Sequence, residues 1–168
     1  MSDKQVWRGF MSVVLVLTAC GGLRGTVGSA QSSDSQQGLE ASELQGVEKA
    51  KTPEEKIKIC LNIAGERLKI IDSATRRGNE QDLTKAVAGF RVALEKAEDV
   101  FSQEPATKPG FRKIAEPMLR TIRKYGASLL EILKKSPEDL RKHIQAAMET
   151  AERISDVLAL QLEKSSKK

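Results

Sequence analysis

Apolar residues recur at intervals of three and four positions from about residue 52 to the end of this 168-residue chain. This spacing places the apolar side chains on one face of an α-helix, whose period is 3.6 residues. A half-buried strand would instead alternate apolar and polar residues, and no such alternation occurs after Lys51. Few aromatic residues (4%) and many charged residues (30%) also suit long amphipathic helices. The sequence therefore predicts an all-α domain.

Local signals divide this periodic region into four helices. Thr52 followed by Pro53 and two glutamates is typical of a capped helix start, and Ser136-Pro137-Glu138-Asp139 repeats the signal. Gly78-Asn79 is a strong stop between the first two helices. The four predicted core-facing series are Ile57, Leu61, Ala64, Leu68 and Ile71; Leu83, Val87, Phe90, Leu94, Ala97 and Phe101; Phe111, Ile114, Met118, Ile122, Tyr125, Leu129 and Ile132; and Leu140, Ile144, Ala147, Ala151, Ile154, Leu158 and Leu162.

The third predicted helix contains a proline at position 117, which leaves two positions for its start. Either the helix begins near Glu116 with Pro117 in its first turn, or it begins near Pro109 and is kinked at Pro117. The apolar spacing continues through Pro117, which favours the kinked helix. Gly126 weakens the middle of the same helix.

The short Gly78-Asn79 connection makes the first two helices antiparallel neighbours. We predict an antiparallel four-helix bundle made of two αα-hairpins over residues 52–165. Two stacked hairpins of a helical repeat are the alternative, because the Thr/Ser-Pro-Glu start occurs twice. The segment 67–101, with its Arg-Arg-Gly-Asn turn, resembles helical-hairpin domains of bacterial exported proteins of unknown function, a resemblance that implies no activity.

The N-terminal segment has the three parts of a secretory signal. Lys4 and Arg8 precede an apolar stretch, residues 11–19, which small residues follow. The stretch is far shorter than the roughly 20 residues of a membrane-spanning helix. Its end, Leu17-Thr18-Ala19-Cys20, resembles the lipobox of bacterial lipoproteins. That resemblance implies cleavage before Cys20, lipid on Cys20 and anchoring in the cell envelope, and Gly21 favours the outer membrane.

A second cleavage site competes with the lipobox. Gly28-Ser29-Ala30 before Gln31 fits the small-x-small rule of ordinary secretion, although Arg24 lies between it and the apolar stretch. Residues 20–51 are rich in glycine, serine and glutamine, and such a segment cannot bury enough apolar surface to fold. The predicted organisation is a signal peptide (1–19), a flexible tether (20–51) and a four-helix domain (52–165).

The sequence contains no recognisable catalytic or metal-binding constellation, so we expect a protein that is not an enzyme and needs no cofactor. The single histidine, His143, has no marked carboxylate or nucleophile beside it and is predicted to lie at the surface or at its boundary. The Glu-x-x-His motif of di-metal bundles is absent. Cys60 lies on an apolar face and is predicted to be a buried free thiol, since lipid would block Cys20.

Charge gives only broad limits on partners. A net charge of +5 with interspersed acids and few aromatics is no nucleic-acid signature. The third helix is the most basic element, and its cations either pair with acids on a neighbouring helix or face an acidic partner or lipid. These basic residues are Arg112, Lys113, Arg120, Arg123, Lys124, Lys134 and Lys135.

Two functions are consistent with these features. The first is a lipid-anchored interaction or scaffold module that binds another envelope protein. The second is a binder of a small molecule or lipid in the space between helices, widened at Pro117 and Gly126. An exposed apolar patch would favour the first, and a closed cavity near Pro117 would favour the second.

Overall fold

The computed structural model describes residues 39–105 and 107–166, and in these residues every regular element is a helix. The prediction of an all-α domain is confirmed. Cys20 and the two candidate cleavage sites lie outside the described residues. The helices are α1 (Ala41–Lys49), α2 (Pro53–Arg77), α3 (Glu80–Ser102), α4 (Phe111–Lys135) and α5 (Glu138–Ser166). No described helix is long and apolar enough to cross a membrane.

The helix α1 lies within residues 20–51, and the prediction of a flexible tether did not anticipate it. It begins with a capping box between Glu40 and Glu43. Val47 is buried against the core, and Arg67 of α2 donates a 2.7 Å hydrogen bond to the Glu43 carboxylate. Only a few apolar residues mark this helix in the sequence. Its stability depends on packing against α2, which composition alone does not reveal.

The start of α2 follows the signal that the sequence predicted. The Glu55 backbone N–H donates to the Thr52 side-chain oxygen at 3.2 Å, and the Glu55 carboxylate accepts a hydrogen bond from the Thr52 backbone N–H. At the other end Gly78 adopts a left-handed conformation with φ 66°, which a residue with a Cβ rarely does. The two ends therefore satisfy backbone groups that the helix itself leaves unpaired.

We expect Thr52→Ala to lower the free energy of unfolding by about 1 kcal/mol, because the Glu55 N–H loses its acceptor. Urea unfolding followed by circular dichroism measures the change. Thr84→Ala is the matched control, since the Thr84 hydroxyl donates only to the Glu80 carbonyl inside α3 and lies at the surface. Equal effects of the two substitutions would contradict a capping role.

The helix α4 begins at Phe111 and runs through Pro117 as one element, so a start near Glu116 is wrong. Gly110 precedes it with φ 97°. Pro117 has no N–H and cannot donate to the carbonyl of Lys113, so one hydrogen bond of the helix is missing there. Pro117 is exposed, whereas the apolar spacing through it buries Ala115 and Met118 in the core.

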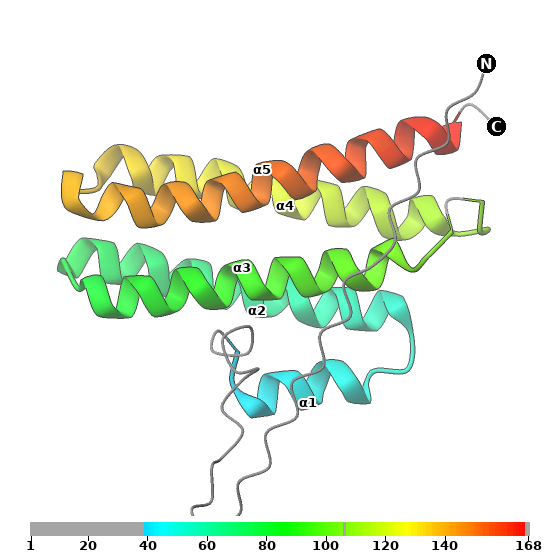
Figure 1. Ribbon diagram of the computed structural model, residues 1–168, viewed down its shortest axis with the longest axis horizontal. Coiled ribbons are helices and arrows are strands. Elements are labelled where there is room, and N and C mark those ends of the chain that lie inside the picture. The colour runs from blue at the N-terminus through cyan, green and yellow to red at the C-terminus, as the bar shows by residue number, and fades with distance from the viewer. Residues whose placement is uncertain (1–38, 106, 167–168) are drawn as a thin grey trace, which may run out of the picture. The chain divides into compact units, whose positions relative to one another are not determined.

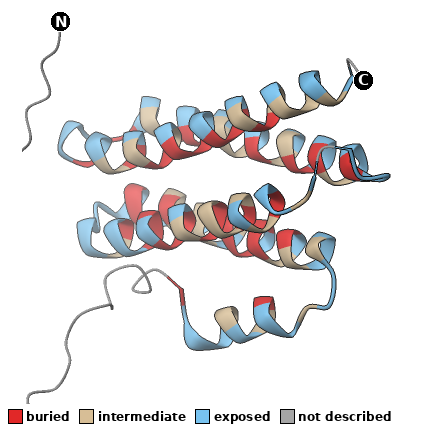
Figure 2. Cartoon of the chain, turned by 45° about the vertical axis from the view of Figure 1, so that its right-hand side comes forward, coloured by how far each residue is buried: buried red, intermediate tan, exposed pale blue. Residues whose placement is uncertain are grey.

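The helices differ in how closely they pair. The association of α2 with α3 is the most extensive, followed by that of α4 with α5; α3 also packs on α5. The pair α2 and α4 associates less extensively than these, and α1 packs on α2 (Figure 1). Buried residues lie on the helix faces that meet one another, and exposed residues lie on the outer faces (Figure 2). The core draws side chains from all four long helices.

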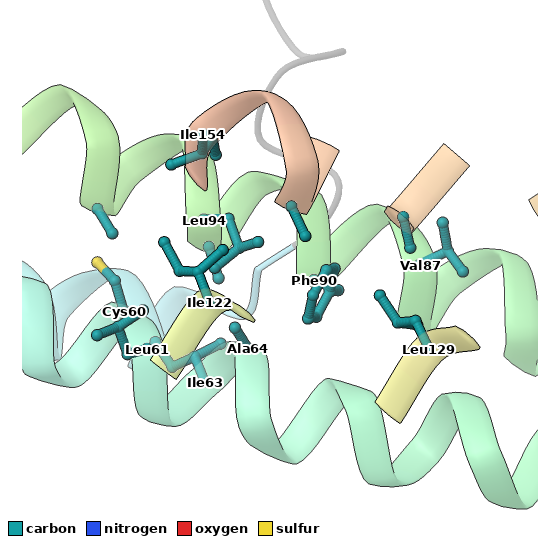
Figure 3. Close-up of a cluster of buried hydrophobic side chains, with 14 of the residues drawn as sticks. Cys60, Leu61, Ile63, Ala64, Val87, Phe90, Leu94, Ile122, Leu129 and Ile154 are labelled. Carbon is teal, nitrogen blue, oxygen red and sulfur yellow. The ribbon is translucent and has the colours of Figure 1, made fainter. Parts of the chain in front are cut away.

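The centre of the core is filled by apolar side chains that are almost fully removed from solvent. Phe90 of α3 is 0% exposed and meets the ring of Tyr125 edge to face, with ring centroids 6.0 Å apart. Ala64 of α2, Ile122 of α4 and Ile154 of α5 belong to the same cluster (Figure 3). Of the residues predicted to face the core, all are buried except the half-buried Leu68, Ile114, Tyr125 and Leu162.

Candidate functional site

The candidate residues that the structure describes do not come together in one catalytic arrangement. His143 of α5 is at the boundary of the protein, as predicted, with its side chain 20% exposed. Its Nε2 lies 3.0 Å from a carboxylate oxygen of Glu80 at the start of α3, and the Lys142 ammonium lies 3.7 Å from the same oxygen. The hydrogen bond with His143 and then the nearby Lys142 lower the pKa of Glu80.

No local pattern in the sequence marks the His143–Glu80 pair, because 63 positions separate the two residues. Glu80 is exposed, and neither side chain lines the three grooves described below. The pair joins α3 to α5 at the protein surface. An exposed ion pair of this kind contributes little to stability.

No group of His, Cys, Asp and Glu that could hold a metal ion occurs among the residues described by the structure. Cys60 is free and fully buried in the core. Burial raises the pKa of the Cys60 thiol to about 11, although Lys96 opposes this shift. Because the thiolate is the nucleophile in cysteine chemistry, we expect Cys60 to react poorly in the folded protein.

We expect Cys60 to resist alkylation by iodoacetamide at pH 8 in the folded protein and to react quickly in urea. Burial blocks access to the sulfur, and the raised pKa keeps the thiol protonated at this pH. Mass spectrometry of the peptide that contains Cys60 measures the modified fraction at each urea concentration. Rapid modification without urea would contradict the burial of this thiol.

The basic residues of α4 are mostly unpaired. Arg112 pairs with Glu116 at 3.3 Å and Lys134 with Glu131 at 2.7 Å, so both acidic partners lie on α4 itself. None of the seven basic residues of α4 forms an ion pair with a neighbouring helix in the described structure. The exposed cations Lys113, Arg120, Arg123 and Lys124 form no ion pair with any described residue. At about 100° per residue, the first, second and last of these share one face of the helix.

A groove runs between α2 and α4 and is divided by Tyr125. The Tyr125 hydroxyl donates a hydrogen bond to the Leu61 carbonyl at 2.7 Å. Its oxygen would lie only 2.9 Å from a Cβ atom on Gly65. On one side of this contact a cavity of about 390 Å³ is lined partly by Leu68 and Ile132. On the other side a cavity of about 270 Å³ is lined partly by Ile114 and Pro117. Both are open to solvent.

The sequence predicted one space between helices, widened at Pro117 and Gly126, but these two residues line two separate grooves. Pro117 lines the α2–α4 groove, whereas Gly126 lines a groove of about 420 Å³ between α4 and α5. Leu130 and Leu160 are the large apolar side chains that the described surface exposes, at 41% and 57%. These two residues do not form the extended apolar patch that would by itself mark a binding surface.

The described surface thus carries an unpaired basic face on α4 and grooves on either side of it. Burial raises the pKa of Tyr125 in the first groove, with a smaller contribution from Glu66, so its hydroxyl stays a hydrogen-bond donor. No protein-family model, curated protein or solved structure matches the chain.

Proposed function

We propose that this protein is a bacterial lipoprotein, held at a membrane of the cell envelope by lipid on Cys20. We further propose that its helical domain is a non-catalytic module that binds another envelope protein. The lipobox-like Leu17-Thr18-Ala19-Cys20 supports the anchor.

The arrangement of the long helices supports a rigid module. We infer that α2 to α5 form a four-helix bundle of two antiparallel hairpins, with α1 packed on the outside of α2. Very short connections at Gly78-Asn79 and Ser136-Pro137 join α2 to α3 and α4 to α5, and these are the pairs that associate most extensively. Helices joined by such short loops run antiparallel.

The unpaired cations of α4 are the observation that carries the binding role. This helix has seven basic and two acidic residues, and Lys113, Arg120 and Lys124 share an exposed face that borders the α2–α4 groove. A stabilising network would bring acids from α2 or α5 to these cations, and the described structure shows no such pair. We therefore assign this face, which we call the α4 basic face, to an acidic surface of a partner protein.

Intact mass of the protein extracted from membranes tests the anchor. We expect a chain that begins at Cys20 and carries added acyl mass, and Cys20→Ser should remove both the acyl mass and the association with membranes. A chain that begins at Gln31 without lipid would show ordinary secretion. The module would then be a diffusible binder rather than an anchored one.

Photo-crosslinking in intact cells tests the α4 basic face. A photoreactive residue in place of the exposed Pro117 should give a discrete protein adduct, and the same residue at Lys85 of α3 should not. Lys113→Glu, Arg120→Glu and Lys124→Glu together should abolish the adduct, because they reverse the charge that the partner recognises. Lys51→Glu, Lys85→Glu and Lys164→Glu together make the same change in net charge elsewhere and should retain it.

Two outcomes would reject this binding face. Equal adducts with both triple variants would show that the charges of α4 are not recognised. No adduct, together with charge-dependent binding of the purified protein to vesicles that contain anionic lipid, would show that the α4 basic face contacts the membrane instead of a protein.

The lining of the α2–α4 groove supports a second function, the binding of an anionic amphiphile, although the cavity at Pro117 is open to solvent and is not the closed cavity expected of such a binder. Ile57, Ile114 and Met118 supply apolar lining beside Pro117. Two lysines that form no ion pair with a described residue, Lys58 and Lys113, line the same cavity, as does one acid, Glu54. A large apolar side chain in the lining of the groove, as in Thr121→Trp, should exclude such a ligand. Native mass spectrometry with a fatty acid as the probe measures binding, and equal occupancy in the variant would reject this function.

A further inference from the structure

The second groove, between α4 and α5, has walls of opposite charge. Arg123 belongs to the α4 wall, whereas Glu152 and Asp156 belong to the α5 wall. All three side chains are exposed, and none forms an ion pair or a hydrogen bond within the described part of the chain. The apolar floor between the walls includes Ile122 and Ala151. The groove thus presents separated, unneutralised charges on either side of a small apolar strip.

The α4 wall also carries Gly126, at a position where neither the backbone conformation nor the packing of the single chain requires a glycine. A Cβ built on Gly126 meets nothing within 4 Å, and its φ is not positive. Glycine inside a helix destabilises it relative to alanine. Neither backbone conformation nor internal packing compensates for this cost at Gly126. A residue without a Cβ does allow another chain to approach the helix closely.

Leu130 lies on the same wall, one turn further along α4, and is 41% exposed. It is one of two large apolar side chains exposed on the described surface. A partner seated over the groove would remove it from water, which is favourable. Arg123, Gly126, Leu130, Glu152 and Asp156 define what we call the α4–α5 face.

We propose that the α4–α5 face binds a second copy of this chain, so that the protein forms a two-fold symmetric dimer. A two-fold axis that runs along the groove places the α4 wall of each copy opposite the α5 wall of the other copy. Arg123 of each copy then meets Glu152 and Asp156 of the other copy, and the same contact forms twice. The groove of the isolated chain holds these charges apart, and the second copy neutralises them.

The charge pattern favours a second copy over a different protein. A self-complementary face carries opposite charges on two walls that a two-fold rotation interchanges. Arg123 and the two acids stand on opposite walls of this groove, as such a face requires. A different partner would have to present the reversed pattern independently. The α4 basic face points about a quarter turn away from Arg123 and stays free in the dimer, so this inference does not depend on the proposed function.

A charge-swap experiment tests the dimer directly. Sedimentation equilibrium of the full chain in density-matched detergent should give a dimer for the unmodified protein. Arg123→Glu should weaken association at least about tenfold, because each contact then joins acids to acids. Glu152→Arg with Asp156→Arg should weaken it similarly, since each contact then joins only basic groups.

Mixing the two variants should restore the dimer. In the mixed pair, the carboxylate introduced at position 123 of one copy meets the two guanidinium groups introduced on α5 of the other. The native acids of the first copy meet the native Arg123 of the second. Both contacts are again attractive, so a heterodimer should form where neither variant self-associates. A monomeric unmodified protein, or a mixture that stays monomeric, would overturn the proposal.

Gly126→Ala provides a second test, in which stability and association should change in opposite directions. Alanine should raise the unfolding temperature of the monomer, because it favours the helix and its Cβ meets nothing. It should also weaken dimerisation, because the Cβ intrudes on the second copy. Gly46→Ala in α1 is the matched control: its Cβ also meets nothing, and it should leave association unchanged. Unchanged association in Gly126→Ala would place Gly126 outside the interface and overturn the proposed face.

Discussion

Replacement of Phe90 by alanine should lower the free energy of unfolding by about 3–5 kcal/mol, a large part of the stability of a domain this size. Phe90 is 0% exposed and lies in the central cluster with side chains of α2, α4 and α5. Alanine removes most of the apolar surface of this side chain. It leaves a cavity, because the surrounding helices relax only partly into the empty space. The edge-to-face contact with Tyr125 is lost as well.

Urea unfolding followed by circular dichroism measures this effect, with the midpoint and the slope fitted separately. Leu160→Ala is the control, because Leu160 is 57% exposed and its truncation should change stability by no more than about 0.5 kcal/mol. A loss below about 1 kcal/mol in Phe90→Ala would show that Phe90 does not lie in a close-packed core.

Gly65→Ala should destabilise the protein by about 1–3 kcal/mol, although alanine is the better helix former. The added Cβ would lie 2.9 Å from the Tyr125 hydroxyl oxygen, so Tyr125 must move and give up its 2.7 Å hydrogen bond to the Leu61 carbonyl. The next nearest atom of Tyr125 is at 3.6 Å, which is an ordinary contact distance. The predicted clash therefore involves one oxygen atom.

The sign of the Gly65→Ala effect should reverse when that oxygen is removed. In a Tyr125→Phe background, alanine at position 65 meets no close atom, and its helix propensity should stabilise the protein by up to about 1 kcal/mol. A double-mutant cycle of the four proteins measures the coupling. Additive effects would indicate that α2 and α4 do not meet at this point.

The apolar period by itself predicted the long helices after Lys51 and which face of each of them is buried. The prediction placed 25 residues on core-facing series, and the four that are only half-buried show its limit. Leu68, Ile114 and Tyr125 line the α2–α4 groove, where the helices associate less extensively than the other long neighbours. Periodicity describes one helix at a time and contains no information on how closely two helices approach.

Helix ends could also be predicted, because the groups that cap them are near in sequence. Thr52 bonds to a residue three positions away, and Gly78 directly follows the helix that it ends. The start of α4 has no such cap in the sequence, and Pro117 is compatible with either start. The apolar spacing that continues through Pro117 favours the earlier start, and the helix does begin at Phe111, with Phe111 and Ala115 buried in the core.

The contacts that define surfaces were decided by the tertiary structure alone. Glu43 and Arg67 form an ion pair although 24 positions separate them in the sequence, and Glu80 and His143 are paired across 63 positions. No local sequence pattern indicates which of such distant residues will pair. Only a few apolar residues mark α1, which is stabilised by its packing on α2. Unpaired charges on α4 follow from the same cause, since the sequence determined that the cations exist while the packing of α2 and α5 decided which acids they can reach.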